Sequence, residues 1–439
     1  MKRIYPDHTY GPLPRSGCWW DETCEAPEWP IFDALPAVDV AIIGAGFTGL
    51  SAALHLAESG VSVAVLDAQQ PGWGASGRNG GFCCIGGSKL SEDKLAKIYG
   101  ADTAQEFHQA EMDAVTLVAR LLKRLNIDAD THSDGETQFA HRARDVESLR
   151  RRAETVARIY NVEPRFIEQQ DLASNGMEGP FFGALTNPFG FALNPRKYVV
   201  GLARAAAKAG AKLFANSPVS KISPVGGGYQ LTINGRMLRS EKVVVATNGY
   251  SCEDLPDWLR GRYLPTQSNV IVTRPLTEEE LKTQGWTTLQ MSYDTRNLLH
   301  YFRLMPDRRF LFGMRGGFQS SASADARAAR RNRADFEAMF PAWKHVESPY
   351  SWSGMVCLSR NLTPYVGPVP EMPGVYAGLA YHGNGVAMGS YAGKKLAELV
   401  LGTGKVPAVL ATPMKKFPLG TARRAVMLPL YAGYTLADL

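Results

Sequence analysis

The sequence lacks the residue spacings of a structural metal site. Its six cysteines form no Cys-x-x-Cys pair, and its eight histidines form no cluster at zinc-ligand spacing. Cys83 and Cys84 are adjacent in the chain, which is a poor geometry for a mutual disulfide. We therefore expect no bound metal, and we expect reduced cysteines in a cytoplasmic protein.

The sequence also lacks a long apolar run. Residues 1–14 are polar and rich in proline, without the apolar stretch of a signal peptide. The most apolar stretches, Val38–Gly46 and Val243–Thr247, are too short to span a bilayer. The chain has 439 residues, of which 45% are hydrophobic and 21% charged, so it is neither disordered nor a coiled coil nor a small disulfide module. This length predicts at least two domains.

Glycine and positive charge are the two features present in excess. The chain has 43 glycines, and its formal net charge is +6. Glycine allows tight turns and a close approach of backbone to a ligand, whereas a basic surface attracts anionic partners. The basic runs Arg142–Arg152 and Arg327–Arg333 are interrupted by acids or alanines at helical spacing. We interpret these runs as solvated helix faces and expect no nucleic-acid partner.

The first glycine motif lies inside a predicted βαβ unit. The apolar run Val38–Ile43 is typical of a buried parallel strand, Thr48–Ser59 has helical periodicity, and Val61–Asp67 is a second strand. The sequence GAGFTG, residues 44–49, stands between the first strand and the helix. This context is the one in which such glycines bind a dinucleotide.

Each glycine of that motif has its own task. Gly44 permits the tight turn, Gly46 lets backbone N–H groups approach a pyrophosphate, and Gly49 allows the helix to pack closely on the strand. Asp67, at the end of the second strand, is placed to accept a hydrogen bond from a ribose hydroxyl.

Three further motifs point to the same ligand. GASGRNGG, residues 74–81, predicts a second anion site lined by backbone, with Arg78 able to bind phosphate. KVVVATNGY, residues 242–250, is a buried strand whose end places backbone near the dinucleotide from the opposite side. YHGNGVAMGSYAG, residues 381–393, leads into an apolar helix, whose positive N-terminus suits a flavin that becomes anionic on reduction.

The order of predicted elements favours two interleaved domains. After the βαβ unit come helices over Glu106–Leu125, Arg142–Tyr160 and Arg196–Ala209, then many strands, then a helix over Asn384–Leu401. Residues 1–36 carry tryptophans without periodicity and predict an arm packed on the body.

These motifs together resemble the FAD-dependent oxidoreductases of the D-amino-acid oxidase family, nearest the branch of γ-glutamylputrescine oxidases. Further stretches carry the likeness: residues 293–317, LTPYVGPVP at 362–370 and FPLGTARRAVMLPLYAGY at 417–434. The resemblance implies an α/β fold, in which a Rossmann-type FAD-binding domain is interleaved with an α+β substrate domain built on an antiparallel sheet. It places the FAD-binding domain at 37–90, 191–255 and 359–415, the substrate domain at 91–190 and 256–358, and a C-terminal tail at 416–439.

The resemblance also carries a set of FAD-contacting positions onto this sequence. They are Gly44, Gly46, Phe47, Thr48, Gly49, Asp67, Ala68, Gly74, Ser76, Gly77, Arg78, Asn79, Gly80, Val219, Thr247, Asn248, Gly249, Thr363, Gly383, Asn384, Gly385 and Val386. The family more often has Glu at the position of Asp67, and many relatives have His where Asn384 stands. Cys357 lies in a stretch like the one that attaches flavin covalently in monomeric sarcosine oxidases, but the following Thr-Pro is one residue out of step, so we expect non-covalent FAD.

The chemistry implied by the resemblance is oxidation of an amine or amino acid. A hydride passes from the C–H beside the nitrogen to flavin N5, the imine product hydrolyses, and O2 or another acceptor takes the electrons. Substrate residues are predicted on the strand HYFR, where alternation separates His300 and Phe302 from Tyr301 and Arg303. Arg303 is a candidate for a substrate carboxylate, and His382 lies beside the flavin helix. Tyr293 and Asp294, just before this strand, are further candidates, with Asp294 for a distal ammonium.

Three alternatives remain open at this stage. A dehydrogenase that passes electrons to a quinone or a protein carrier would have the same sequence features. A flavin-dependent RNA-modifying enzyme is motivated only by the positive charge. A nicotinamide dehydrogenase is disfavoured by the second glycine loop and the final glycine-rich helix start. The oligomeric state is left undetermined.

Overall fold

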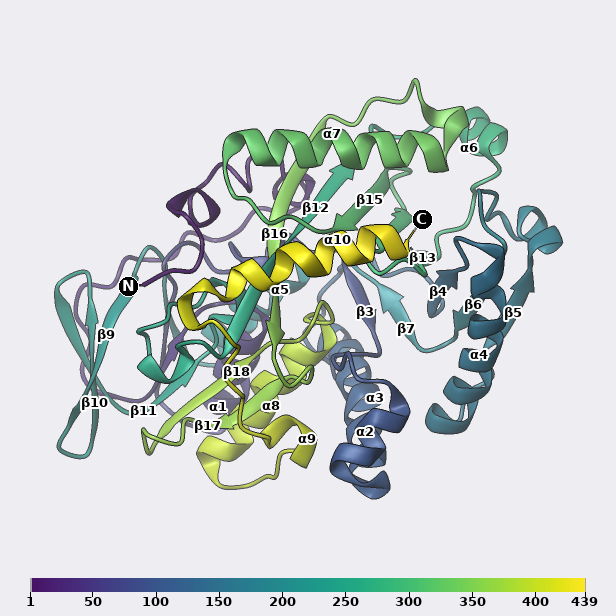
Figure 1. The fold of residues 1–439 in the computed structure, drawn as a ribbon. Coiled ribbons are helices and arrows are strands. Elements are labelled where there is room, and N and C mark those ends of the chain that lie inside the picture. The colour runs from purple at the N-terminus through teal and green to yellow at the C-terminus, as the bar shows by residue number, and fades with distance from the viewer. Residues whose placement is uncertain (1, 439) are drawn as a thin grey trace.

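The computed structural model describes residues 2–438 and contains two large sheets (Figure 1). The first sheet has the strand order β17-β18-β11-β1-β2-β8, and β9 and β10 extend it as a hairpin from β11. Its members are β1 (Val38–Ile43), β2 (Val63–Leu66), β8 (Lys212–Phe214), β9 (Val219–Val225), β10 (Gly228–Ile233), β11 (Arg236–Val245), β17 (Tyr365–Pro368) and β18 (Val375–Leu379). Strands β18, β11, β1, β2 and β8 run parallel to one another, which confirms the predicted Rossmann-type arrangement.

The second sheet is antiparallel except for one pair. Its order is β16-β12-β15-β14-β13-β4-β6-β5, and only β13 and β4 run parallel. Its members are β4 (Glu136–Phe139), β5 (Arg165–Glu168), β6 (Gly183–Asn187), β12 (Tyr263–Val272), β13 (Met291–Asp294), β14 (His300–Leu304), β15 (Phe310–Arg315) and β16 (Tyr350–Ser359). A small sheet pairs β3 (Phe82–Cys84) with β7 (Gly190–Ala192). Each large sheet therefore collects strands from separate parts of the chain, as the interleaved fold requires.

The helices cover the sheets in two groups. They are α1 (Phe47–Glu58), α2 (Glu92–Tyr99), α3 (Ala101–Arg124), α4 (Val146–Tyr160), α5 (Pro195–Lys208), α6 (Glu278–Gln284), α7 (Ala322–Met339), α8 (Ala387–Leu401), α9 (Ala408–Ala411) and α10 (Met427–Ala437). Helices α1, α3, α5 and α8 share one hydrophobic core with a face of the first sheet, whereas α7 packs on the second sheet (Figure 1). Helix α3 thus contributes to the first core, although its residues fall in a segment predicted for the substrate domain.

Local sequence explains where these helices begin. The side chain of Asn194 accepts hydrogen bonds from the backbone amides of Arg196 and Lys197, and Pro195 occupies the first turn of α5. Helix α1 instead begins after Gly46 without any side-chain cap, so its first amides remain available to other partners. No helix within residues 2–438 is long and apolar enough to cross a membrane.

Candidate active site

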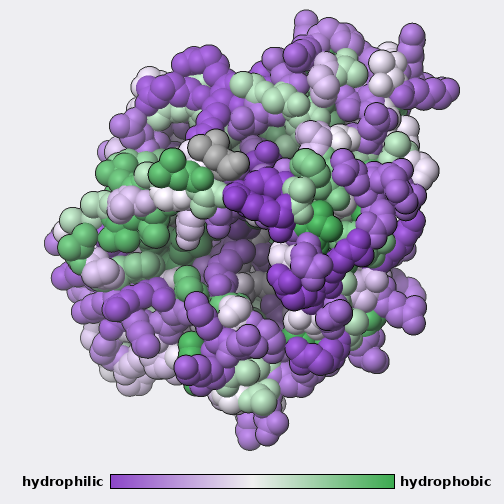
Figure 2. Space-filling view, turned by 45° about the vertical axis from the view of Figure 1, so that its right-hand side comes forward, coloured by the Kyte–Doolittle hydropathy of each residue, from purple (hydrophilic) through white to green (hydrophobic). Residues whose placement is uncertain are grey.

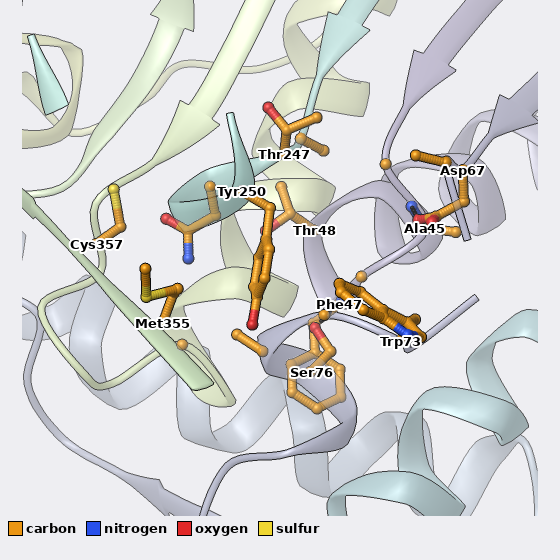
Figure 3. Close-up of a pocket in the computed structure, with 18 of the residues that line it drawn as sticks. Ala45, Phe47, Thr48, Asp67, Trp73, Ser76, Thr247, Tyr250, Met355 and Cys357 are labelled. Carbon is orange, nitrogen blue, oxygen red and sulfur yellow. Dashed lines mark hydrogen bonds between the residues drawn. The ribbon is translucent and has the colours of Figure 1, made fainter. Parts of the chain in front are cut away.

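A deep cavity lies where β1, β2 and β11 end, at the start of α1 (Figure 3). The turn between β1 and α1 depends on its glycines. Gly44 has φ +101°, and a Cβ on it would lie 2.8 Å from the carbonyl oxygen of Ala246 at the end of β11. A Cβ on Gly49 would lie 1.9 Å from the carbonyl oxygen of Gly44. Only glycine lets the helix begin this close to both strands.

Two side chains hold this turn in place. Asp67 accepts hydrogen bonds from the backbone amides of Ala45 (2.7 Å) and Gln69 (2.8 Å). Ser76, in the second glycine loop, accepts one from the amide of Phe47 (2.9 Å) through its Oγ. Burial raises the pKa of the Asp67 carboxyl, and both backbone bonds oppose that shift. The first turn of α1 is therefore tied to β2 on one side and to the second glycine loop on the other.

The second glycine loop is fixed by the N-terminal arm and by β16. Trp20 donates from its indole Nε1 to the carbonyl oxygen of Asn79 (2.9 Å), and Arg15 donates to that of Trp73 (2.6 Å). Trp352, on β16, donates to the carbonyl oxygen of Arg78 (2.7 Å). The N-terminal arm thus packs on the body, where Arg15 and Trp20 hold the loop that borders the cavity.

Arg78 does not line the first cavity, and its guanidinium already contacts other groups of the protein. Its guanidinium stacks 4.0 Å from the ring centre of Trp73, and it donates to the carbonyl oxygens of Trp73 and Ser353. One nitrogen, Nη2, is buried without a hydrogen-bond partner. The side chain is only 2% exposed. We therefore correct the interpretation of Arg78 as a phosphate ligand: it braces the loop against Trp73 and β16.

The fourth motif forms the wall opposite α1. His382 has φ +51° and a fully buried side chain that bridges two segments. Its Nδ1 donates to the carbonyl oxygen of Gly87 (2.7 Å), and its Nε2 accepts from the backbone amide of Ser359 (3.1 Å). Burial lowers the pKa of His382 to about 4, so the ring is neutral near pH 7. Both ring nitrogens are used by backbone, so His382 positions the loop and is not free to act as a base.

Most of the FAD positions predicted from sequence line this first cavity. They are Gly44, Gly46, Phe47, Thr48, Asp67, Ala68, Gly74, Ser76, Asn79, Val219, Thr247, Asn248, Gly383, Gly385 and Val386. Arg78, Gly80 and Asn384 instead line an adjoining cavity. Gly49, Gly77, Gly249 and Thr363 line neither cavity, and the three glycines among them permit close packing behind the wall.

Sequence reasoning missed several residues of the first cavity. Arg3 and Tyr10 reach it from the N-terminal arm, and Met355 and Tyr381 come from β16 and the loop before α8. The ring of Tyr250 lies between Met355 and Trp73 in Figure 3. The arm has no regular residue spacing, so nothing in the sequence could have placed Arg3 and Tyr10 at the cavity.

The first cavity fits a dinucleotide. Glycines bring backbone to its surface along α1, the second loop and the loop before α8, as close approach to a pyrophosphate requires. A Cβ on Gly46 would lie 2.8 Å from Ser76 Oγ and would fill the cradle at the helix start. The positive end of α1 faces this cradle and suits a pyrophosphate.

A second cavity of about 1680 Å³ continues from the first. The two share lining residues, among them Asn79, Met355 and Gly383. The second cavity is bounded by β4, β14 and β15 of the antiparallel sheet and by the loop after β3. A substrate in it would meet a cofactor in the first cavity at this junction.

Tyr301 lines the second cavity as predicted for the strand HYFR. Its hydroxyl lies 2.8 Å from Ser268 Oγ. The ring passes close to two glycines: a Cβ on Gly80 would lie 2.9 Å from it and one on Gly313 would lie 2.2 Å from it. The last glycines of the second loop therefore make room for a substrate-side tyrosine as well as for the cofactor.

His300 and Arg303 do not line either cavity. His300 is buried between Asp294 (3.0 Å) and Asp335 (3.1 Å), which raise its pKa against the opposing effect of burial. Arg303 lies in a separate pocket, where its guanidinium donates to Leu193 O (2.8 Å) and to His132 Nε2 (3.1 Å). We therefore correct the interpretation of both side chains as substrate ligands, because each is already engaged elsewhere.

Arg315, and not Arg303, lies where the sequence analysis expected an arginine that could bind a substrate carboxylate. It lies on β15, two residues after Gly313, which pairs with Tyr301 on β14. A Cβ on Gly383 would lie 2.2 Å from Arg315 Nη2, so the guanidinium stands at the junction of the two cavities. The register of β14 with β15, together with the alternation along Phe310–Arg315, puts Arg315 on the face shared with Tyr301.

Cys357 lines the first cavity and is 2% exposed. Burial raises the pKa of its thiol to about 12, so the nucleophilic thiolate is scarce near neutral pH. This environment favours non-covalent FAD.

The basic runs are mainly helix faces, as expected. Arg151 on α4 pairs with Glu147, and Arg333 on α7 pairs with Glu337, both at helical spacing. Arg152 is the exception, because it lines the second cavity. Positive charge in these runs thus takes part in local ion pairs and in the lining of the second cavity.

Comparison with known proteins agrees with this geometry. The family model of the DAO type, "FAD dependent oxidoreductase", matches residues 39–399. "Probable oxidoreductase OrdL" of Rhizobium meliloti is 31% identical over 434 residues, which cover 97% of this chain and 98% of that protein. The gamma-glutamylputrescine oxidoreductase of Escherichia coli is 30% identical over 400 residues, which cover 90% of this chain and 91% of that protein.

The solved structure of a glycine oxidase from Bacillus cereus has the same fold. It superposes with a TM-score of 0.68 at 20% identity and covers 85% of this chain and 98% of that one. The glycine cradle, the parallel sheet and the family match lead to one conclusion. This chain belongs to the DAO family of FAD-dependent oxidoreductases, and its cofactor is FAD.

Proposed function

We propose that this enzyme oxidises the C–N bond of a small amine or amino acid and passes the electrons to O2. The single observation that carries the proposal is the junction of the two cavities: a dinucleotide cradle opens directly into a second cavity walled by the antiparallel sheet. The similarity to a gamma-glutamylputrescine oxidoreductase and to a glycine oxidase supports the substrate class.

The residues of the second cavity supply binding and orientation. Bound FAD supplies the acceptor for the hydride that leaves the carbon beside the nitrogen. Arg315 is placed to hold a substrate carboxylate at the junction, and Tyr301, fixed by Ser268, bounds the same space. Met355 and Val356, which line both cavities, present apolar surface there.

We keep the division into domains as part of this proposal. All strands of the parallel sheet fall within residues 37–90, 191–255 and 359–415, and nearly all residues of the antiparallel sheet fall within 91–190 and 256–358. The six cysteines are all free, which supports a cytoplasmic location.

The proposal is tested by anaerobic mixing of the purified holoenzyme with amines, N-methyl amino acids and γ-glutamyl amines. Loss of the visible flavin absorbance, with release of a carbonyl product, is expected for the true substrate class. Failure of every amine to reduce the flavin would overturn the proposal. Readmission of air then separates the oxidase from a dehydrogenase: rapid recovery of absorbance with oxygen uptake supports the oxidase, and slow recovery that a quinone accelerates supports the dehydrogenase.

A further inference from the structure

Three cationic side chains line the second cavity without an acidic partner. They are Lys89 in the loop after β3, Arg152 on α4 and Arg315 on β15. Within residues 2–438, no carboxylate forms an ion pair with any of them. Their mutual repulsion is evident in Lys89, whose pKa is lowered first by Arg315 and then by burial and by Arg152. The three cations therefore form one cluster.

Two other charged groups of this cavity already have partners within the protein. Asp294 pairs with Arg296 and His300. Arg78 keeps its positive charge, but its guanidinium is held by the backbone carbonyl oxygens of Trp73 and Ser353.

One carboxylate remains to face the cationic cluster. Glu136, on β4, is buried, and its strongest cationic influence is Arg152. Burial raises the pKa of Glu136 to about 7, and the pKa of Lys89 is lowered to about 7, so each is partly charged near neutral pH, whereas Arg152 and Arg315 stay cationic and keep the cavity positive. Lys89 and Arg152 are exposed to solvent and Arg315 is half-buried, so all three cations are accessible from the cavity, and a ligand that brings negative charge gains affinity there.

The cluster extends away from the junction with the FAD cavity. Arg315 stands at the junction, beside Gly383. Arg152, on α4, lines the cavity together with Tyr293 on β13 and Glu136 on β4. In the sheet, β4 lies three strands away from β15, which carries Arg315. One carboxylate bound at Arg315 therefore leaves the charge of Lys89 and Arg152 unmatched.

We propose that the substrate is an amine with two carboxylates, one held by Arg315 next to the reacting carbon and the other held by Lys89 and Arg152. The inference rests on the proposed function and deepens it, because it selects acidic amines among the amine and amino-acid substrates.

A binding test on the holoenzyme separates this inference from turnover. Unreactive dicarboxylates from malonate to adipate, and the monocarboxylates of matching length, are titrated while the flavin spectrum is followed. The best dicarboxylate is expected to bind at least about tenfold more tightly than its monocarboxylate, as for one added charge-assisted contact. Equal affinities across the whole series would overturn the inference.

Variants on neighbouring positions of one helix supply the control. Arg152→Gln should bring the affinity for the best dicarboxylate down to that of the matching monocarboxylate. Arg151→Gln removes the same charge from the exposed face of α4, where Arg151 pairs with Glu147, and should leave the preference intact. A loss of preference in Arg151→Gln, or its retention in Arg152→Gln, would contradict the assignment.

A turnover test completes the design. Iminodiacetate is compared with N-methylglycine, and aspartate and glutamate are compared with asparagine and glutamine, by anaerobic flavin reduction. Faster reduction by the dicarboxylic member of at least one pair is expected. If the amides and monoacids react as fast as the diacids, the inference fails while the proposed amine oxidation stands; if no amine reacts, the proposed function fails instead.

Discussion

The hydroxyl of Ser76 lies 2.9 Å from the backbone nitrogen of Phe47, and this contact joins the two glycine loops of the cofactor cavity. Because the Phe47 amide is one of the first in α1, the serine fixes the cradle that a pyrophosphate would enter.

Ser76→Ala should therefore weaken FAD binding. Loss of one hydrogen bond worth ~1 kcal/mol corresponds to a rise in the FAD dissociation constant of about fivefold. Titration of the apoprotein by flavin fluorescence measures it. Ser62→Ala is a matched control, since Ser62 bonds Asp39 at the opposite end of β1 and β2; an equal effect in both variants would contradict the local role.

Asp67 should contribute to stability as well as to cofactor binding. Asp67→Ala leaves the amides of Ala45 and Gln69 without their acceptor, and we expect the free energy of unfolding to fall by about 2–4 kcal/mol. Asp67→Asn keeps one acceptor oxygen and should lose about half as much. Denaturant unfolding of the apoproteins measures both values, and an Asp67→Ala protein as stable as the wild type would refute the assignment.

His382 should make stability depend on pH on the acidic side. Its folded-state pKa of about 4 lies below the ordinary value of 6.5, so the unfolded chain binds more protons between these values. Stability is therefore complete above pH 6.5 and is lost as pH falls toward 4, by roughly 3 kcal/mol from this group. His382→Gln should flatten the fall of Tm between pH 6.5 and 4. Identical pH slopes in the two proteins would exclude this role.

The flavin should be released when the protein is denatured by acid. The buried thiol of Cys357, with its pKa of about 12, gives little thiolate for a bond to the cofactor. Acid precipitation is expected to leave a colourless pellet and a yellow supernatant, for the wild type and for Cys357→Ala alike. A yellow wild-type pellet that becomes colourless in the variant would show a covalent bond.

Two arginines on adjacent strands should differ in their effect on KM. Arg315→Met removes a cation from the junction of the cavities and should raise KM for a carboxylated substrate by about tenfold or more. Arg303→Met acts in a separate pocket and should leave KM within about twofold of the wild type. Steady-state assays at equal FAD loading make the comparison, and a larger rise for Arg303→Met would reverse our placement.

The cofactor side of the molecule was predictable because its signals are local. A strand, three spaced glycines, a helix and an acid lie within one βαβ unit, and steric limits on φ and on helix–strand packing make that pattern specific. The positions of Gly44, Gly49 and Asp67 follow from it directly.

The substrate side depends on long-range register, which the sequence does not display. Alternation along β14 put Tyr301 and Arg303 on one face of the sheet. Only the pairing of β14 with β15 shows that Arg315, rather than Arg303, reaches the junction of the cavities. Arg152 was hidden for a similar reason: within a basic helix, nothing local distinguishes the one arginine that faces a cavity from its solvated neighbours.

The wall of the FAD cavity extends along the chain from Arg3 to Val386. The first sheet is also completed by late segments of the chain, because β18 pairs with β11 and β17 pairs with β18. During synthesis, therefore, the dinucleotide motif emerges early, but the chain must be made as far as Val386 before every wall of its binding site is present. We expect FAD to bind only after that point, so the glycine turn between β1 and α1 must first form without its ligand.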